Sequence, residues 1–173
     1  MVVFEIAQQL HKQGEKVALL ALLDKTSSQL PKSYPSLLEY IQIHLSNLWQ
    51  LNSQGRLKYV MDKFNYKFVH KGNYREFMIG QWSQSLAPEY INVLDTNLEA
   101  IRNYQPQVYP GKVTLFRCQI QPINQALHHD LGWSELVTGD VEIHSIPGDH
   151  FNILKEPHVR VLAKKLKSCL ERL

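Results

Sequence analysis

The chain has 173 residues, 44% of them hydrophobic, and a formal net charge of +3. This length and composition suit one domain with a sizeable core, and the mild, scattered charge predicts no binding to nucleic acid. Two distant cysteines, Cys118 and Cys169, fit neither a disulfide framework nor a metal-ligand spacing. The sequence has no secretory leader and no apolar run near 18 residues, so we expect a cytoplasmic protein with no membrane partner.

The first predicted element is a helix over residues 1–13, ended by Gly14. Its apolar residues recur at helical spacing: Val3, Ile6, Ala7 and Leu10. No capping residue or turn precedes this helix, although most helices carry one. We therefore expect the natural beginning of the element to lie upstream of Met1.

Residues 17–23 form an unbroken apolar run that ends at Asp24. Such a run after a helix and a short turn predicts a central parallel strand that is buried on both faces. Asp24 then lies at the carboxyl edge of the sheet, where α/β folds keep their ligands. The alternative is a cap or turn residue, because residues 25–28 have the composition of a loop.

Residues 31–105 show helical periodicity and no strand pattern. Three amphipathic stripes account for it: Leu37, Tyr40, Ile41, His44, Leu45 and Leu48; Leu57, Val60, Met61, Phe64 and Phe68; Ile91, Leu94, Leu98 and Ile101. We expect residues 1–30 and 106–173 to form the core and residues 31–105 to form a helical lid. The apolar stripes suit a packed core as well as the wall of a binding channel.

Two further strands are predicted at residues 112–118 and 141–146, joined by a loop over residues 119–139. The second strand runs into the turn Pro147-Gly148-Asp149-His150. A last helix opens at Pro157, with an apolar face of Val159, Leu162, Ala163, Leu166, Leu170 and Leu173. The alternation of helices and strands predicts an α/β fold with a parallel sheet.

Asp24 and His150 follow two of these strands, in the chain order acid, then histidine. A histidine takes a proton from a hydroxyl nucleophile when a carboxylate holds its tautomer and stabilises the imidazolium. The pair therefore predicts the acid and base of a catalytic triad. For His150 alone, a histidine in a surface loop is the alternative.

The sequence resembles the thioesterase domains of non-ribosomal peptide and polyketide synthetases, within the α/β-hydrolases. The matching segments are residues 3–10 (VFEIAQQL), 19–24 (LLALLD), 113–117 (VTLFR), 131–133 (LGW) and 146–151 (IPGDHF). The resemblance implies a partial α/β-hydrolase fold with a helical lid, in which Asp24 is the triad acid and His150 the general base. In that family a Gly-x-Ser-x-Gly-Gly elbow precedes the helix that begins here at Met1, and this chain lacks it. The chain therefore resembles the C-terminal portion of a thioesterase, with the nucleophilic serine upstream.

By this resemblance, the function is release of an acyl or peptidyl chain from a carrier protein, by hydrolysis or cyclisation, in secondary metabolite biosynthesis. The implied partners are a carrier domain with its phosphopantetheine arm and the upstream half of the thioesterase domain. No metal or bound cofactor is implied. As given, the chain is expected to be inactive. The alternatives are a non-catalytic remnant or carrier-docking module, and a hydrolase that acts on a free ester.

Other polar residues are weaker candidates. Asp130 is a rival for the triad acid, because some α/β-hydrolases take it from the loop after the following strand. The run His128-His129-Asp130 lacks a distant third metal ligand, and Asp149 suits a turn. An exposed position is expected for His158, and no elbow surrounds the serines Ser27, Ser28 and Ser145.

Overall fold

The structure of the chain is a computed structural model that describes residues 1–27, 34–65 and 89–173. The chain divides into two compact units, residues 1–50 with 105–173, and residues 51–104. The first unit contains every strand of the described chain and both candidate residues, Asp24 and His150. The second unit contains helices α3 (Ser53–Phe64) and α5 (Glu89–Asn103).

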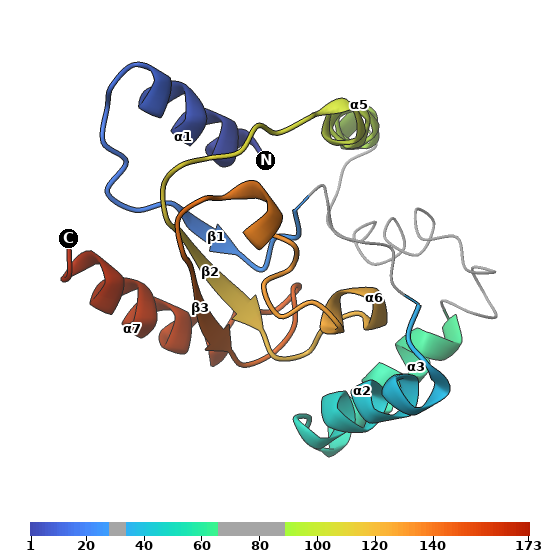
Figure 1. Cartoon of the computed structure of the whole chain (residues 1–173). Coiled ribbons are helices and arrows are strands. Elements are labelled where there is room, and N and C mark those ends of the chain that lie inside the picture. Colours follow the sequence, from blue (N-terminus) through green and yellow to red (C-terminus); the bar gives the residue numbers. More distant parts are fainter. Residues whose placement is uncertain (28–33, 66–88) are drawn as a thin grey trace. The chain divides into compact units, whose positions relative to one another are not determined.

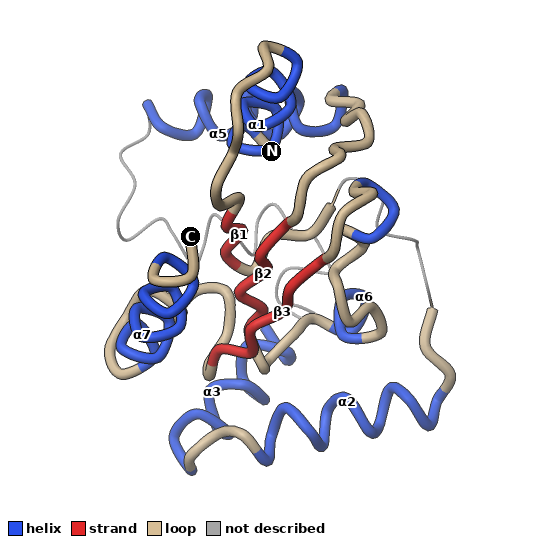
Figure 2. The backbone as a smooth tube through the Cα atoms, turned by 60° about the vertical axis from the view of Figure 1, so that its left-hand side comes forward, coloured by secondary structure: helices blue, strands red, loops and turns tan. Residues whose placement is uncertain are grey.

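A parallel sheet forms the centre of the first unit, with the strand order β1-β2-β3 (Figure 2). The strands are β1 (Ala21–Leu23), β2 (Val113–Cys118) and β3 (Val141–Ile146). Leu22 pairs with Leu115, and Leu115 pairs with Ile143. All three strands run in the same direction, so their carboxyl ends meet at one edge.

Two helices cover opposite faces of this sheet (Figure 1). On one face, α1 (Val2–Lys12) contributes Phe4 and Ala7 to a cluster with Leu22 and Leu115. On the other face, α7 (His158–Leu170) contributes Leu162 and Cys169, which pack with Phe116 and Ile146. This three-layer arrangement confirms the predicted α/β class.

The first strand differs from its prediction. Only Ala21–Leu23 forms β-structure, rather than the whole run of residues 17–23. β1 also lies at an edge of the sheet in the described chain and not at its centre, and Leu23 is 38% exposed. An apolar run reports burial, but it does not report which neighbours a strand has.

Residues 34–65 and 89–105, the described parts of the predicted lid, contain helices and no strand. Helix α2 (Leu37–Trp49) begins at Ser36, whose hydroxyl and backbone N–H bond Glu39 in a capping box. α2 contacts the short helix α6 (Ile123–Ala126) within the first unit. Phe68 and the side chains of Ile91, Leu94 and Leu98 lie outside the described residues. The predicted boundaries of core and lid stay a prediction.

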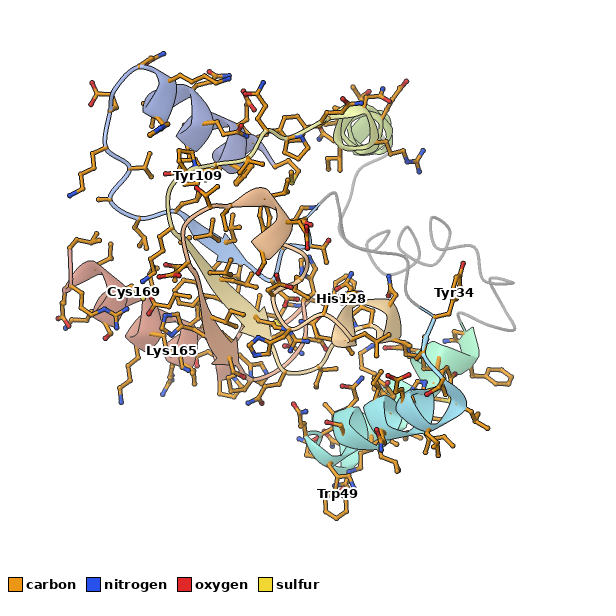
Figure 3. All side chains as sticks on the ribbon, viewed as in Figure 1. Tyr34, Trp49, Tyr109, His128, Lys165 and Cys169 are labelled. Atoms are coloured by element: carbon orange, nitrogen blue, oxygen red, sulfur yellow. The ribbon has the colours of Figure 1, made fainter. Side chains whose placement is uncertain are left out.

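Two further details of the C-terminal part of the chain differ from the prediction. Leu170 and Leu173 are exposed, at 53% and 65%, whereas Cys169 takes the buried position on α7 (Figure 3). The predicted loop over residues 119–139 contains α6 and a 3₁₀ turn, η2 (Ser134–Leu136). None of the helices in the described part of the chain combines the length and the apolar character that a bilayer span needs.

Substitution of Phe4 tests how α1 packs on the sheet. Its ring is fully buried and lies 5.0 Å from the ring of Trp133 and 5.9 Å from that of Tyr109, between centroids. We expect Phe4→Ala to lower the free energy of unfolding by about 3–5 kcal/mol, measured by urea denaturation. Val3 is 55% exposed on the same helix, so Val3→Ala should change it by less than about 0.5 kcal/mol. Equal effects of the two substitutions would contradict this packing.

Candidate active site

Asp24 is the first residue after β1, and its carboxylate is buried, with 1% of the side chain exposed. Its backbone N–H donates to the carbonyl of Phe116, 2.8 Å away, which extends the pairing of β1 by one residue. The residue then adopts a φ of 46°, in the left-handed region that aspartate tolerates better than most side chains. This turn ends the strand at the carboxyl edge of the sheet.

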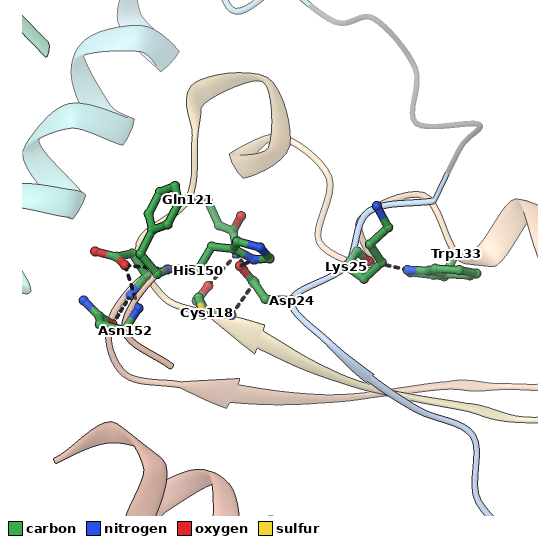
Figure 4. Close-up of polar contacts among 9 residues, drawn as sticks. Asp24, Lys25, Cys118, Gln121, Trp133, His150 and Asn152 are labelled. Atoms are coloured by element: carbon green, nitrogen blue, oxygen red, sulfur yellow. Dashed lines mark hydrogen bonds and ion pairs between the residues drawn. The ribbon is translucent and has the colours of Figure 1, made fainter. Parts of the chain in front are cut away.

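Three N–H groups surround the Asp24 carboxylate (Figure 4). Oδ1 accepts from the backbone N–H of Cys118, at 2.7 Å, and from the side-chain Nε2 of Gln121, at 2.6 Å. Oδ2 lies 3.2 Å from Nδ1 of His150. A buried carboxylate is costly unless its oxygens are hydrogen-bonded. These donors satisfy the buried carboxylate oxygens and aim one of them at the histidine.

The loop that carries His150 is held by its own polar groups. Asp149 Oδ1 accepts from the backbone N–H groups of Phe151 and Asn152, at 2.9 and 3.2 Å. In return, the side-chain oxygen of Asn152 accepts from the Asp149 N–H at 2.8 Å. Gly148 precedes them with a φ of 89°, and its carbonyl accepts from Ile120 N–H. His150 is thus presented by a braced turn.

Trp133 braces the segment after Asp24 from the other side. Its indole Nε1 donates to the carbonyl of Lys25 at 2.6 Å, while the ring is fully buried against Phe4 of α1. The backbone N–H of Ser27 also donates to the carbonyl of Leu131. The loop after Asp24 is therefore tied to the same core that holds α1.

The pairing changes the basicity of His150. The hydrogen bond to Asp24 raises the pKa of the imidazole, against partial burial and the positive charge of Lys25, which lower it. The ring remains accessible, with 56% of the side chain exposed. Because Nδ1 faces Asp24, Nε2 is the nitrogen available for proton exchange.

Cys118 ends β2 directly beside the acid. Burial, and then the charge of Asp24, raise the pKa of its thiol far above the ordinary value. The thiolate is the nucleophilic form of cysteine, so Cys118 stays protonated and serves the site through its backbone N–H.

The rival acid is engaged elsewhere. The Asp130 carboxylate accepts from the backbone N–H groups of Gly132 and Ser134, at 3.0 and 2.8 Å. Burial raises the pKa of Asp130, but the hydrogen bonds from Ser134 and Gly132 outweigh this and lower it. Asp24, and not Asp130, therefore lies within hydrogen-bond reach of His150.

The remaining candidates lie apart from the pair. Asp149 shapes the His150 turn, as predicted, while His158 is half-buried rather than exposed. His129 is exposed and His128 is half-buried. Ser27 is buried, Ser145 is exposed on β3, and Ser28 lies outside the described residues.

One group in the described chain has the composition of a metal site: Glu142 and His144 on β3 with Cys169 on α7. His144 Nε2 lies 2.9 Å from Glu142 Oε1 and 3.3 Å from Cys169 Sγ. However, Lys112 and Arg172 already pair with Glu142, at 2.7 and 2.6 Å, and the Lys112 hydrogen bond leads the interactions that lower its pKa to about 2. Two cations beside the carboxylate oppose a third, so this group is better suited to an ion-pair network.

The sequence pattern gave no sign of two parts of the site. Gln121 and the N–H of Cys118 reach Asp24 across 97 and 94 residues of sequence. Neither belongs to a motif. The Leu-Gly-Trp segment belongs to the family resemblance, but nothing in its sequence indicates the bond from Trp133 to the carbonyl of Lys25.

Gly148 tests how the turn presents His150. A methyl group there would overlap the Asn152 side-chain oxygen and lie 2.9 Å from the His158 ring. Gly14 has a similar φ of 82° with nothing within 4 Å, so Gly14→Ala isolates the backbone strain. We expect Gly148→Ala to cost about 1–3 kcal/mol more than Gly14→Ala in unfolding free energy, because overlap adds to the strain. Equal costs would mean that the turn relaxes around the methyl group.

The raised pKa of His150 predicts a pH-dependent stability. The ion pair with Asp24 stabilises the folded chain fully below the ordinary histidine pKa of about 6.5. This contribution is lost as the pH rises through the higher pKa of folded His150. The difference in unfolding free energy between the wild type and His150→Ala should therefore be larger at pH 5.5 than at pH 9, by urea denaturation. A difference that grows with pH would contradict the pairing.

Comparison with known proteins identifies similar folds. No family model matches the chain. Chondramide synthase cmdD of Chondromyces crocatus is 23% identical over 186 residues, which is 99% of this chain and 5% of that protein. The Vlm2 thioesterase domain, solved with a bound dodecadepsipeptide, has a TM-score of 0.53 and 21% identity, over 95% of this chain and 60% of that one. The four-domain nonribosomal peptide synthetase AB3403 has a TM-score of 0.57 and 16% identity, over 96% and 13%.

The chain thus spans about 60% of the solved thioesterase domain and a small share of each synthetase. At these identities the likeness shows the fold, and that fold carries the Asp24–His150 pair at its strand ends. The chain therefore has, over the part that it spans, the α/β-hydrolase fold of the thioesterase domains of such synthetases.

Proposed function

We propose that the chain is the acid–base portion of a thioesterase that releases an acyl or peptidyl chain from a carrier protein. The observation that carries the proposal is the buried Asp24 carboxylate bonded to Nδ1 of the accessible His150 ring. A histidine held in this way has one free nitrogen for proton transfer and a carboxylate to stabilise its charged form. This arrangement suits acyl transfer from a thioester.

In the proposed reaction, Nε2 of His150 takes the proton from a serine hydroxyl while the serine oxygen bonds the thioester carbon. The carbon–sulfur bond then breaks, and the imidazolium returns its proton to the departing thiolate, which leaves as the thiol. Water, or a nucleophile within the acyl chain, next attacks the acyl-serine with His150 again as the base. Asp24 stabilises the imidazolium in both halves.

We propose that this serine lies outside residues 1–173. Met1 packs against the core cluster that contains Trp133, and the Trp133 indole bonds the carbonyl of Lys25, the neighbour of Asp24. A segment that leads into α1 would therefore arrive near the loop that follows Asp24. The positive end of the helix dipole also suits the negative charge that develops in acyl transfer.

The missing portion of such a domain is also the proposed partner of two apolar surfaces. On α1 the exposed apolar residues are Val2, Val3, Ile6 and Leu10, at 73, 55, 49 and 37%. Leu23 is exposed on β1, which is an edge strand of the described sheet. Surfaces of this kind lower the solubility of an isolated chain.

The proposed function also implies a carrier partner, a lid and a cellular location. The substrate arrives on the phosphopantetheine arm of a carrier domain, and residues 31–105 form a helical lid. No bound cofactor is needed, and the protein works in the cytoplasm. The rival is a docking module without turnover, for which the exposed apolar residues of α2, such as Trp49 at 79%, would be the contact surface (Figure 3).

The test compares the 173-residue chain with a form extended upstream to include the serine elbow. We expect the extended form to release a carrier-mimicking acyl thioester and to react with a fluorophosphonate probe. The short chain should do neither, since loss of the nucleophile lowers the rate by about 10⁶. In the extended form, Asp24→Asn should lower turnover by roughly 10⁴.

Asp130→Asn is the matched control and should leave turnover nearly unchanged, because Asp130 bonds its own loop. No turnover by a folded extended form would favour the docking module. Equal rates on a free ester and on the thioester would favour a general esterase. Histidine-dependent turnover by the short chain would mean that the nucleophile lies within residues 1–173.

A further inference from the structure

The segment from Cys118 to Gln121 bonds Asp24, the end of β3 and the turn that precedes His150. Cys118 N–H and Gln121 Nε2 donate to Asp24 Oδ1. Between them, Gln119 N–H donates to the carbonyl of Ile146, at 2.9 Å, and Ile120 N–H to that of Gly148, at 3.0 Å. Four consecutive residues thus fix the acid and the turn that carries His150 in one frame.

Gln121 is the only side chain among those four donors, and it is 3% exposed. Its Nε2 donates to the carbonyl of Cys118, at 3.0 Å, as well as to Asp24. Both partners accept hydrogen bonds only, so the amide cannot be reversed without setting its oxygen against a carboxylate. The direction of the Gln121 amide is therefore determined by its surroundings.

This arrangement carries a cost. Gln121 Oε1 is buried with no hydrogen-bond partner in the described part of the chain. A buried acceptor without a partner is unfavourable, because it loses its hydrogen bonds to water on folding. An apolar side chain of the same size would avoid this cost, but it would give Asp24 one donor fewer.

A second buried amide holds the backbone of Gln121. Asn47 of α2 is 3% exposed, and its Nδ2 donates to the carbonyl of Gln121 at 3.0 Å. α2 thereby contacts the segment that supports Asp24, in agreement with its packing on α6. Gln121 is fixed at its backbone by one element and at its side chain by another.

We infer that Gln121 is a positioning residue, which holds the Asp24 carboxylate so that Oδ2 faces His150; this role rests on the proposed function. With Gln121 replaced, Oδ1 keeps only the Cys118 N–H as a donor, and rotation of the carboxylate about its Cβ–Cγ bond is less restrained. Oδ2 then spends less time against Nδ1 of His150. The ionic stabilisation of the imidazolium falls in proportion.

The experiment follows the His150 imidazole by NMR as the pH is varied, in the full 173-residue chain. The variant Gln121→Met preserves the length of the side chain without its donor, and Gln119→Met, at an exposed position, is the matched control. We expect the pKa of His150 to fall toward its ordinary value in Gln121→Met and to stay unchanged in Gln119→Met. Asp24→Asn should lower it further.

Each other outcome has a defined meaning. If the pKa of His150 is unchanged in Gln121→Met but falls in Asp24→Asn, the positioning role is overturned and the acid–base pair is left intact. A rise in the pKa of His150 in Gln121→Met would also overturn the positioning role. It would mean that the Asp24 carboxylate keeps its position without Gln121 and, with one donor fewer, interacts more strongly with the imidazolium. If the pKa of His150 is unchanged in Asp24→Asn, the two residues do not act as a pair, and the proposed function is overturned as well.

A second measurement remains decisive if Gln121→Met does not fold. In the wild type, the side-chain amide protons of Gln121 should exchange with solvent at least about tenfold more slowly than those of Gln119, because hydrogen bonds to a charged group are worth about 1.5–3 kcal/mol. Their resonances should also shift in Asp24→Asn. Equal exchange rates for the two glutamines would overturn the inference.

Discussion

The structure of the candidate site depends on one buried carboxylate. Asp24 is 1% exposed on its side chain, and an unpaired carboxylate at such a position would be strongly unfavourable. Three donors meet it from residues that are 94, 97 and 126 positions away in the sequence. None of these bonds forms unless β1, β2 and β3 are aligned, so the hydrogen bonding of the Asp24 carboxylate depends on the whole sheet.

The sheet provides this alignment because its strands are parallel and in register. Leu23 pairs with Phe116, and Phe116 pairs with His144, so the strands end close together. Asp24 leaves β1 by a left-handed turn, and the turn at Gly148 leaves β3. The two loops are then braced by different means: Trp133 bonds Lys25, and Asn152 bonds Asp149. The acid therefore has a rigid support, while the accessible His150 ring keeps one nitrogen open.

The charge distribution separates this site from the other polar cluster of the fold. At the sheet edge, a carboxylate meets one titratable partner, His150, and its remaining donors are neutral amides. In the Glu142 cluster, the carboxylate meets two permanent cations, Lys112 and Arg172. The first arrangement contains an imidazole that can gain and lose a proton beside a carboxylate, as proton transfer requires. In the second arrangement, both oxygens of Glu142 are already paired with a cation, which suits a structural role.

Much of the fold was predictable from local pattern. The helical period of residues 1–13, the strands near residues 113–118 and 141–146, and the capping of α2 all follow from signals within one segment. Where the prediction was wrong, the deciding contacts were distant. The apolar run of residues 17–23 could not reveal a short edge strand, and the stripe on α7 could not reveal that Cys169 is buried while Leu170 is exposed.

The sequence by itself determined the α/β class, the order acid then histidine, and the turn chemistry of the Pro-Gly-Asp-His segment, because each depends on residues close together in the chain. Only the tertiary structure decided which aspartate meets His150 and which groups neutralise it. Asp24 ends an apolar run and Asp130 lies in a loop, and in the structure the Asp130 carboxylate accepts from Gly132 and Ser134 of its own loop. Gln121 carries no local signal, since its importance arises from a hydrogen bond across 97 residues of sequence. Contacts of that range depend on the register of the sheet, which no single segment of the chain encodes.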